Sequence, residues 1–229
     1  MQEEQLQNTS LNFKEILKLQ YIVYGLACFV FEYIFYSVAK IIPKPIPALM
    51  IKIPAIDNRI SYTPVFFPVY YFSYFFWIIG FAAIAAAQNR KNLMDFTAGF
   101  AMSVIIGAVF FIALPTVSDR VADGVYSYNY KSELIKFLSD LCFKFDSASN
   151  PFPSFHCMMS TFCYMGIRKN GKISKAFKIY TLIMMILIFL STVLTKQHYV
   201  ADIAGGVIIP IICCSAVKKI NPSAVKAKG

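Results

Sequence analysis

Long apolar segments alternate with shorter polar ones along the whole chain. A membrane-spanning helix needs about 20 mainly apolar residues, and six segments approach that length. They are 19–42, 64–87, 96–114, 155–167, 179–194 and 199–217. The fourth and fifth fall short of it, so flanking residues must extend them. The pattern predicts an all-α, polytopic membrane protein whose six transmembrane helices form one bundle. That bundle covers residues 19–217, between an N-terminal segment at 1–18 and a basic tail at 218–229.

Two connecting segments, 43–63 and 115–153, are longer than a connection between helices requires. The first is rich in proline, which suits an extended surface segment. The second is polar and charged, and it predicts a short helix around residues 132–141. Long connections in a compact domain are often functional, so we expect these two segments to border the site.

The composition excludes an ordinary water-soluble domain. Hydrophobic residues make up 58% of the chain and charged residues only 15%, and the mean hydropathy is +0.58. Soluble domains carry roughly 25% charged residues. The chain has too few charges to cover the surface of a soluble protein of this size, which agrees with a bilayer location.

The net charge of +10 arises from 22 Lys and Arg against 12 Asp and Glu. Basic residues collect on cytoplasmic loops, where they meet anionic lipid, so the charge predicts membrane lipids as partners and no nucleic acid. With the N-terminus inside, the inner segments carry more Lys and Arg than the outer ones. We therefore predict a multi-pass protein of the cell membrane with both termini cytoplasmic. The sequon Asn8-Thr9-Ser10 would then be cytoplasmic and unused.

The cysteines and the N-terminus add little chemistry. Most of the six cysteines lie inside apolar runs and are interpreted as buried apolar residues, with no CxxC pair. The first 15 residues hold three glutamates and no apolar core. We expect no cleavable signal peptide, so that the first helix directs insertion.

The chain contains only two histidines, His156 and His198. Each is predicted at the outer end of a helix, which places both on the same side of the membrane. Pro153 suits the first turn of the helix that carries His156. Asp202 follows His198 at i+4, a spacing that on a helix puts the carboxylate on the same face. There it would accept the second ring N–H and make His198 a competent nucleophile or general base.

These residues resemble motifs of the type-2 phosphatidic acid phosphatase (PAP2) superfamily, which are KxxxxxxRP, PSGH and SRxxxxxHxxxD. The sequence from Pro153 to His156, Pro-Ser-Phe-His, is similar to the second motif with Phe155 in place of Gly. Ser191-Thr192, five further residues, His198 and Asp202 are similar to the third, with Thr192 in place of Arg. The resemblance covers about the last half of the chain and implies a six-helix bundle of the PAP2 type.

Of the three motifs, the first, KxxxxxxRP, agrees least with this sequence. Arg120 is the candidate for its Arg, but Val121 stands where Pro is expected and Ala113 where Lys is expected. Phe155 and the run Thr195–Tyr199 are similar to the branch of sphingomyelin synthases and inositol phosphorylceramide synthases, which are phosphotransferases with the same triad.

The resemblance implies covalent catalysis without a metal or another cofactor. His198, oriented by Asp202, attacks phosphorus, and His156 protonates the leaving oxygen and then deprotonates the acceptor. Water as the acceptor makes a phosphatase, and a lipid or polyol hydroxyl makes a transferase. We favour a lipid phosphate phosphatase that acts on a phosphorylated lipid at the outer membrane face, with head-group transfer as the alternative. The oligomeric state is left open.

The phosphoryl group must be stabilised by cations and N–H donors, although the family's cations are missing at positions 113 and 192. Candidates for the phosphate or substrate site are Arg120, Ser154, Lys196 and Ser191. Three of them have a structural alternative: Arg120 as a solvated loop charge, Lys196 as a snorkelling interfacial cation, and Ser191 as a partner of its own helix backbone.

Further alternatives concern the whole site. His156, His198 and Asp202 have the donor types of a zinc site, or the histidines are structural, or the chain is a non-catalytic lipid binder or transporter that lost phosphate affinity. Glu32 lies in the middle of the first predicted helix, where a carboxylate is costly unless it is paired, and the sequence names no partner. The aromatic run at 66–77 is typical of an interfacial belt, with a lipid-tail groove as the alternative.

Overall fold

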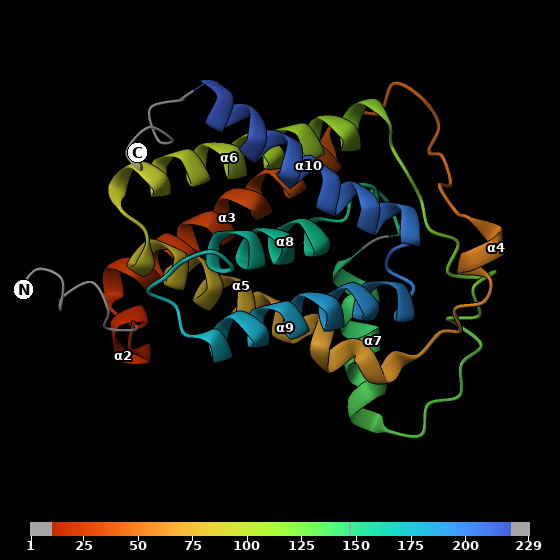
Figure 1. Cartoon of the computed structure of the whole chain (residues 1–229). Helices are drawn as coiled ribbons and strands as arrows, with labels where there is room; N and C mark the ends of the chain where they lie inside the picture. Colours follow the sequence, from red (N-terminus) through yellow and green to blue (C-terminus); the bar gives the residue numbers. More distant parts are fainter. Residues whose placement is uncertain (1–10, 147, 221–229) are drawn as a thin grey trace, which may run out of the picture.

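The structure, a computed structural model, describes residues 11–146 and 148–220, and within them it is helical (Figure 1). The elements are α2 (Phe13–Ile16), α3 (Leu19–Ile41), α4 (Pro54–Asp57), the 3-10 helix η1 (Pro64–Phe66), α5 (Phe67–Ala87), α6 (Arg90–Ala113), α7 (Glu133–Phe145), α8 (Phe155–Ile167), α9 (Lys175–Leu194) and α10 (Val200–Ile220). The sequon Asn8-Thr9-Ser10, most of the segment 1–18 and most of the tail 218–229 lie outside the described residues.

Five stretches in the described part of the chain are long and apolar enough to cross a membrane: α3, η1 with α5, α6, α9 and α10. The sixth predicted segment is helix α8, which has only 13 residues and would extend about 20 Å, less than the hydrocarbon thickness of about 30 Å. Most of its residues are buried, because α5, α9 and α10 pack around it. The prediction of six spans is therefore confirmed for five helices, while α8 is a short helix at the centre of the bundle (Figure 1).

Polar first turns move two helix starts away from the positions that hydropathy predicts. The helix predicted from residue 96 begins at Arg90, because the Asn89 side chain accepts the backbone N–H of Asn92 at 2.8 Å. Helix α9 likewise begins at Lys175, with Ser174 as its N-cap. Such caps satisfy backbone donors that the helix leaves unpaired, so the helices extend beyond their apolar segments.

The two long connections, 42–63 and 114–132, lie at the same end of the bundle as α4 (Figure 1). The start of α3 and the end of α10 lie at the opposite end. A backbone bridge joins Leu49 to Thr116, and another joins Val117 to Ser149. The bundle therefore has a looped end, where the connections are tied together, and a terminal end.

Close packing of α10 on α8 determines where the site forms. A Cβ on Gly206 would come within 2.6 Å of the Ser154 carbonyl oxygen, so only glycine allows this approach. The backbone N–H of Ser154 donates to the carbonyl of Asp202 at 3.0 Å. These contacts bring the start of α8 next to the start of α10, at the looped end.

Candidate active site

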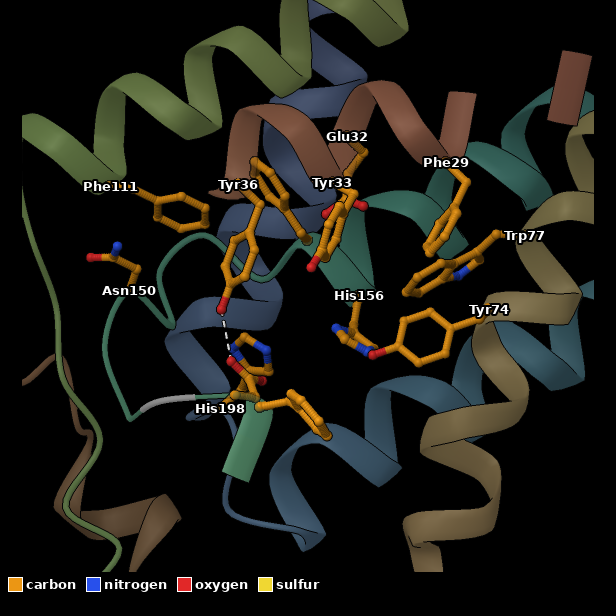
Figure 2. Close-up of a pocket in the computed structure, with 13 residues that line it drawn as sticks. Phe29, Glu32, Tyr33, Tyr36, Tyr74, Trp77, Phe111, Asn150, His156 and His198 are labelled. Carbon is orange, nitrogen blue, oxygen red and sulfur yellow. Dashed lines mark hydrogen bonds between the residues drawn. The ribbon is translucent and has the colours of Figure 1, made fainter. Parts of the chain in front are cut away.

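The two histidines lie close together at the junction of α8 and α10. Their ring centroids are 6.2 Å apart, and both rings line one cavity of about 220 Å³ (Figure 2). Thus the structure brings together the two motifs that the sequence places 42 positions apart.

His198 is oriented by oxygen atoms on one side of its ring. Its Nδ1 lies 2.9 Å from the carbonyl oxygen of Pro151, and since a carbonyl only accepts, Nδ1 carries the hydrogen. The lone pair then resides on Nε2, the nitrogen that a nucleophilic imidazole uses. Backbone N–H groups of Gln197 and His198 both donate to the Thr192 carbonyl at 3.1 Å, which fixes the segment that carries the ring.

Asp202 is buried and lies near His198, but in a different arrangement from the predicted helical pair. Its Oδ2 is 3.5 Å from Nδ1 of His198 and accepts the backbone N–H of Tyr199 at 2.7 Å. His198 precedes α10, which begins at Val200, so the i+4 geometry of a helix does not apply. Asp202 caps the helix and supplies negative charge beside the imidazole, while Pro151 accepts the ring hydrogen.

His156 is held by aromatic rings. Its imidazole stacks on Tyr70, with centroids 4.1 Å apart and planes at 20°, and it meets Trp77 edge-on at 4.9 Å and Tyr74 at 5.6 Å. The Nε2 atom is buried and has no hydrogen-bond partner among the described residues. The ring is thus positioned without using Nε2, which leaves this atom for a ligand.

The rest of the cavity wall combines aromatic rings with acids. The aromatic members are Phe29, Tyr33, Tyr36, Tyr74, Trp77, Phe111, Phe145 and Phe155, and the remaining polar members are Glu32, Asp146 and Asn150. None of the 13 described residues that line the cavity is Lys or Arg. For a phosphate site this lining is unusual, because phosphoryl groups are generally held by cations and N–H donors.

Asp146 and Asn150 are site residues that sequence reasoning missed. Asp146 accepts hydrogen bonds from the hydroxyls of Tyr36, at 2.7 Å, and Tyr70, at 3.2 Å. Asn150 has a positive φ of 61°, and both polar atoms of its buried side chain lack a hydrogen-bond partner in the described structure. Both residues stand in the long connection just before the Pro-Ser-Phe-His motif, which is the signal that could have indicated them.

Arg120 lies behind the cavity rather than in its lining. It is buried, with Nη1 donating to the Asp146 carbonyl at 2.9 Å and Nη2 to Oε1 of Gln197 at 2.6 Å. Its guanidinium also stands over the ring of Phe143 at 4.8 Å. This cation therefore joins the segment before α8 to the segment that carries His198, and the interpretation as a solvated loop charge does not apply.

Lys196 also lies outside the lining. Its Nζ donates to the Asp57 carbonyl at 3.2 Å and is 3.9 Å from Asp123, which pairs more closely with Lys52 at 2.7 Å. Burial lowers the pKa of the Lys196 ammonium, and the charge of Asp123 opposes this effect. Lys196 therefore ties the connections together at the looped end.

The two serines bond to helix backbone. Ser154 is the N-cap of α8 and its side chain accepts the backbone N–H of Cys157 at 3.3 Å. It therefore fixes the start of the helix at Phe155, one residue before His156. Ser191 donates to the Ile188 carbonyl at 2.7 Å, as in the structural alternative. Neither lines the cavity, and neither do Ala113 or Thr192.

The alternative of a zinc site lacks a set of metal ligands in the described residues. In 11–146 and 148–220, no three His, Cys, Asp or Glu side chains are arranged to hold a metal ion.

Comparison with known families gives one match. The family described as the PAP2 superfamily matches residues 61–216, which is more than half of the chain and includes His156, His198 and Asp202. Helix α3, with Glu32, lies outside the matched residues. Comparisons with curated proteins and with solved structures give no match.

Proposed function

Since the chain belongs to the PAP2 superfamily, whose members are generally phosphatases or phosphotransferases, we propose that it is a lipid phosphate phosphatase of the membrane. His198, His156 and Asp202 form its catalytic triad in this proposal. The observation that carries it is the pair of imidazoles 6.2 Å apart at one cavity, with Nδ1 of one ring held by Pro151 and Nε2 of the other unpartnered.

The proposed reaction has two steps. Burial and the neighbouring His198 lower the pKa of the His156 imidazole, and a bound phosphoryl anion opposes this effect and favours its protonated form. Nε2 of His198 attacks phosphorus and forms a P–N bond, the P–O bond to the lipid breaks, and protonated His156 gives its proton to the leaving oxygen. In the second step His156 takes a proton from water, whose oxygen attacks phosphorus. The P–N bond then breaks, which releases inorganic phosphate and restores His198. Asp202 stabilises the positive charge that His198 gains in the first step.

Neutral donors support phosphate binding in a cavity whose described lining residues include no Lys or Arg. The Asn150 amide is buried at the cavity without a partner among the described residues, so its N–H₂ group is available to a phosphoryl oxygen. Preorganised donors of this kind stabilise developing charge in a water-poor site. Arg120 does not line the cavity and acts on it indirectly, through its hydrogen bonds to the Asp146 carbonyl and the Gln197 side chain.

The proposal places the site on the external face. The five candidate spans make this a multi-pass membrane protein, and the histidines lie at the looped end of the bundle, opposite the start of α3 and the end of α10. The rule that basic segments stay in the cytoplasm favours cytoplasmic termini. A phosphorylated lipid in the outer leaflet would then present its head group to the cavity.

The test is product analysis with purified full-length protein in lipid nanodiscs. We expect labelled lipid phosphates to give dephosphorylated lipid and free phosphate, and His198→Ala to abolish this release. The matched control is Lys136→Ala, an exposed cation on α7 that pairs with Asp140 and is far from the motifs in sequence. Release that is equal in wild type and His198→Ala would contradict the proposal, and no release with any substrate would favour a lipid binder or transporter.

Head-group transfer of the sphingomyelin synthase or inositol phosphorylceramide synthase type is the second candidate. It is supported by the aromatic lining and by Phe155, which packs against Phe111 at 4.7 Å and lines the cavity beside His156, where a bulky apolar side chain would help to exclude water. In the same assay, with a lipid alcohol added as acceptor, a new phosphodiester lipid with little free phosphate would establish transfer.

A further inference from the structure

Acidic side chains line the described cavity wall where basic side chains are expected in a phosphatase. Glu32 and Asp146 both line it, together with the two histidines. In the described structure no side chain donates a hydrogen bond to the Glu32 carboxylate or pairs with it, and this residue is only 7% exposed. Asp146, by contrast, accepts two tyrosine hydroxyls. A buried carboxylate without a partner in a membrane helix is costly, which indicates that a ligand supplies the missing positive charge.

Aromatic rings line the same cavity as Glu32. Figure 2 shows Phe29, Glu32, Tyr33 and Tyr36 projecting from α3 over the cavity. From α5, Tyr74 meets Trp77 at 5.3 Å with planes at 85°, and Phe29 at 5.7 Å. These three rings and Glu32 all line the cavity, so a single ligand there can contact both the rings and the carboxylate.

This combination has the chemistry of an ammonium site. The faces of Trp, Tyr and Phe attract cations, and aromatic cages are a common means of binding quaternary ammonium groups. A carboxylate beside the rings supplies the opposite charge. A head group that carries a phosphoryl group without an ammonium would meet the two acids without a compensating cation, so it should bind less tightly than one that carries both.

We propose that Glu32 with Phe29, Tyr74 and Trp77 binds an ammonium group of the substrate, so that the enzyme acts on lipids whose head region carries both a phosphoryl group and a nearby ammonium. The inference rests on the proposed function for the phosphoryl half, which lies at His156 and His198. Its carboxylate, Glu32, and Phe29 belong to α3, which lies outside the segment that matches the family, whereas Tyr74 and Trp77 belong to α5, inside that segment. Two lipid types have this chemistry: a long-chain base phosphate with a free amine, and a phosphodiester with a choline-type head group.

Binding is tested without turnover through the fluorescence of Trp77, since the chain has one tryptophan and it lines the cavity. Phosphocholine is titrated into the full-length protein in nanodiscs, with glycerol phosphate as the ligand that lacks an ammonium. We expect a saturable change in Trp77 fluorescence with phosphocholine, and a Kd for phosphocholine that is about tenfold higher in Glu32→Gln. Glu133→Gln, an exposed acid on α7, should match wild type. Equal Kd values in wild type and Glu32→Gln, or equal binding of both ligands, would overturn the proposal.

A second pair of variants guards against a folding defect in Glu32→Gln. Tyr74 makes ring contacts in the wall, so Tyr74→Phe keeps a ring face and should retain phosphocholine binding. Tyr74→Leu removes the face and should weaken it by about tenfold. If both substitutions gave the same Kd as wild type, the wall would have no role in cation binding.

Turnover then identifies the lipid. Sphingosine 1-phosphate carries a free ammonium, whereas its N-acylated form, ceramide 1-phosphate, does not, and phosphatidylcholine and phosphatidate form a second such pair. In one of the two pairs, we expect the KM of the lipid with the ammonium group to be about tenfold lower than that of its partner. Glu32→Gln should remove that difference in KM. His198-dependent turnover with equal KM values throughout would overturn the ammonium site and leave the phosphatase standing. Glu32-dependent phosphocholine binding without any turnover would support the ammonium site and contradict the proposed phosphatase activity.

Discussion

The Nδ1 atom of His198 faces two oxygens of different kinds, the Pro151 carbonyl at 2.9 Å and the Asp202 carboxylate at 3.5 Å. The shorter contact goes to the uncharged group, so the tautomer does not depend on Asp202 alone. The carboxylate contributes negative charge, which would stabilise the positive charge that the ring gains in the proposed nucleophilic attack. It also caps the first turn of α10 through the N–H of Tyr199.

This division of roles predicts a graded effect of substitutions. Asp202→Asn keeps an oxygen for the Tyr199 N–H and leaves the Pro151 contact in place, so we expect kcat to fall by about ten- to a hundredfold, less than where a carboxylate alone sets the tautomer. His156→Ala and His198→Ala should abolish turnover. Phosphate release and thermal unfolding are measured for all three. Asp202→Asn as inactive as His198→Ala would show that Pro151 does not hold the tautomer.

Arg120 allows a second prediction, because a phosphate ligand and a positioning residue affect kinetics differently. Its guanidinium joins the Asp146 carbonyl to Gln197, and a lysine ammonium cannot make both bonds in this geometry. Arg120→Lys should therefore lower kcat and Tm while KM changes little. A large rise in KM with unchanged kcat would mean that Arg120 contacts the phosphoryl group directly. Lys136→Ala serves as the control on both readouts.

At the scale of elements, the start of α10 is joined to α4 by Asp57. The buried Asp57 carboxylate accepts the N–H of Ile53 at 2.7 Å and that of Val200 at 3.0 Å. Val200 is two residues after His198, so a connection far away in sequence sets the position of the proposed nucleophile. The Lys196 ammonium strengthens the same junction through the Asp57 carbonyl.

Asp57→Ala should therefore reduce both stability and activity. It leaves the two backbone donors without their acceptor, which costs about 1–3 kcal/mol for each buried group, and it loosens the segment before α10. We expect a lower Tm and a lower kcat in the same protein, measured beside Asp140→Ala, an exposed acid on α7. A drop in Tm with unchanged kcat would show that this junction does not position His198.

The helices could be predicted from sequence because a bilayer imposes long apolar runs, and α3, α5, α9 and α10 begin and end within a few residues of the predicted segments. The sequence could not predict that α8 is a short buried helix and not a full span. Its apolar residues pack mostly against protein, and hydropathy does not distinguish a protein environment from a lipid one. Similarly, the spacing of His198 and Asp202 indicated a pair, but its geometry depends on where α10 starts. The partners of Arg120 and the place of Asp146 at the cavity depend on how the connections fold.

At the scale of the whole molecule, the bundle separates two kinds of surface. The looped end holds the cavity, with two acids and two histidines in its lining. At the terminal end, the connection between α8 and α9 carries Arg168, Lys169 and Lys172, all exposed. Positive segments are retained in the cytoplasm during insertion, so this separation of charge would orient the protein and expose the cavity to the outer leaflet.

The orientation can be measured with two single substitutions at opposite ends. Gly171→Cys lies in the basic connection, where no atom comes within 4 Å of an added Cβ, and Lys131→Cys lies exposed in the long connection before α7. A membrane-impermeant maleimide should label Lys131→Cys in intact cells and Gly171→Cys only after permeabilisation. The unsubstituted chain is the control, because five of its six cysteines are buried and Cys214 is partly so. The opposite labelling pattern would place the cavity in the cytoplasm, where the substrate would have to come from the inner leaflet.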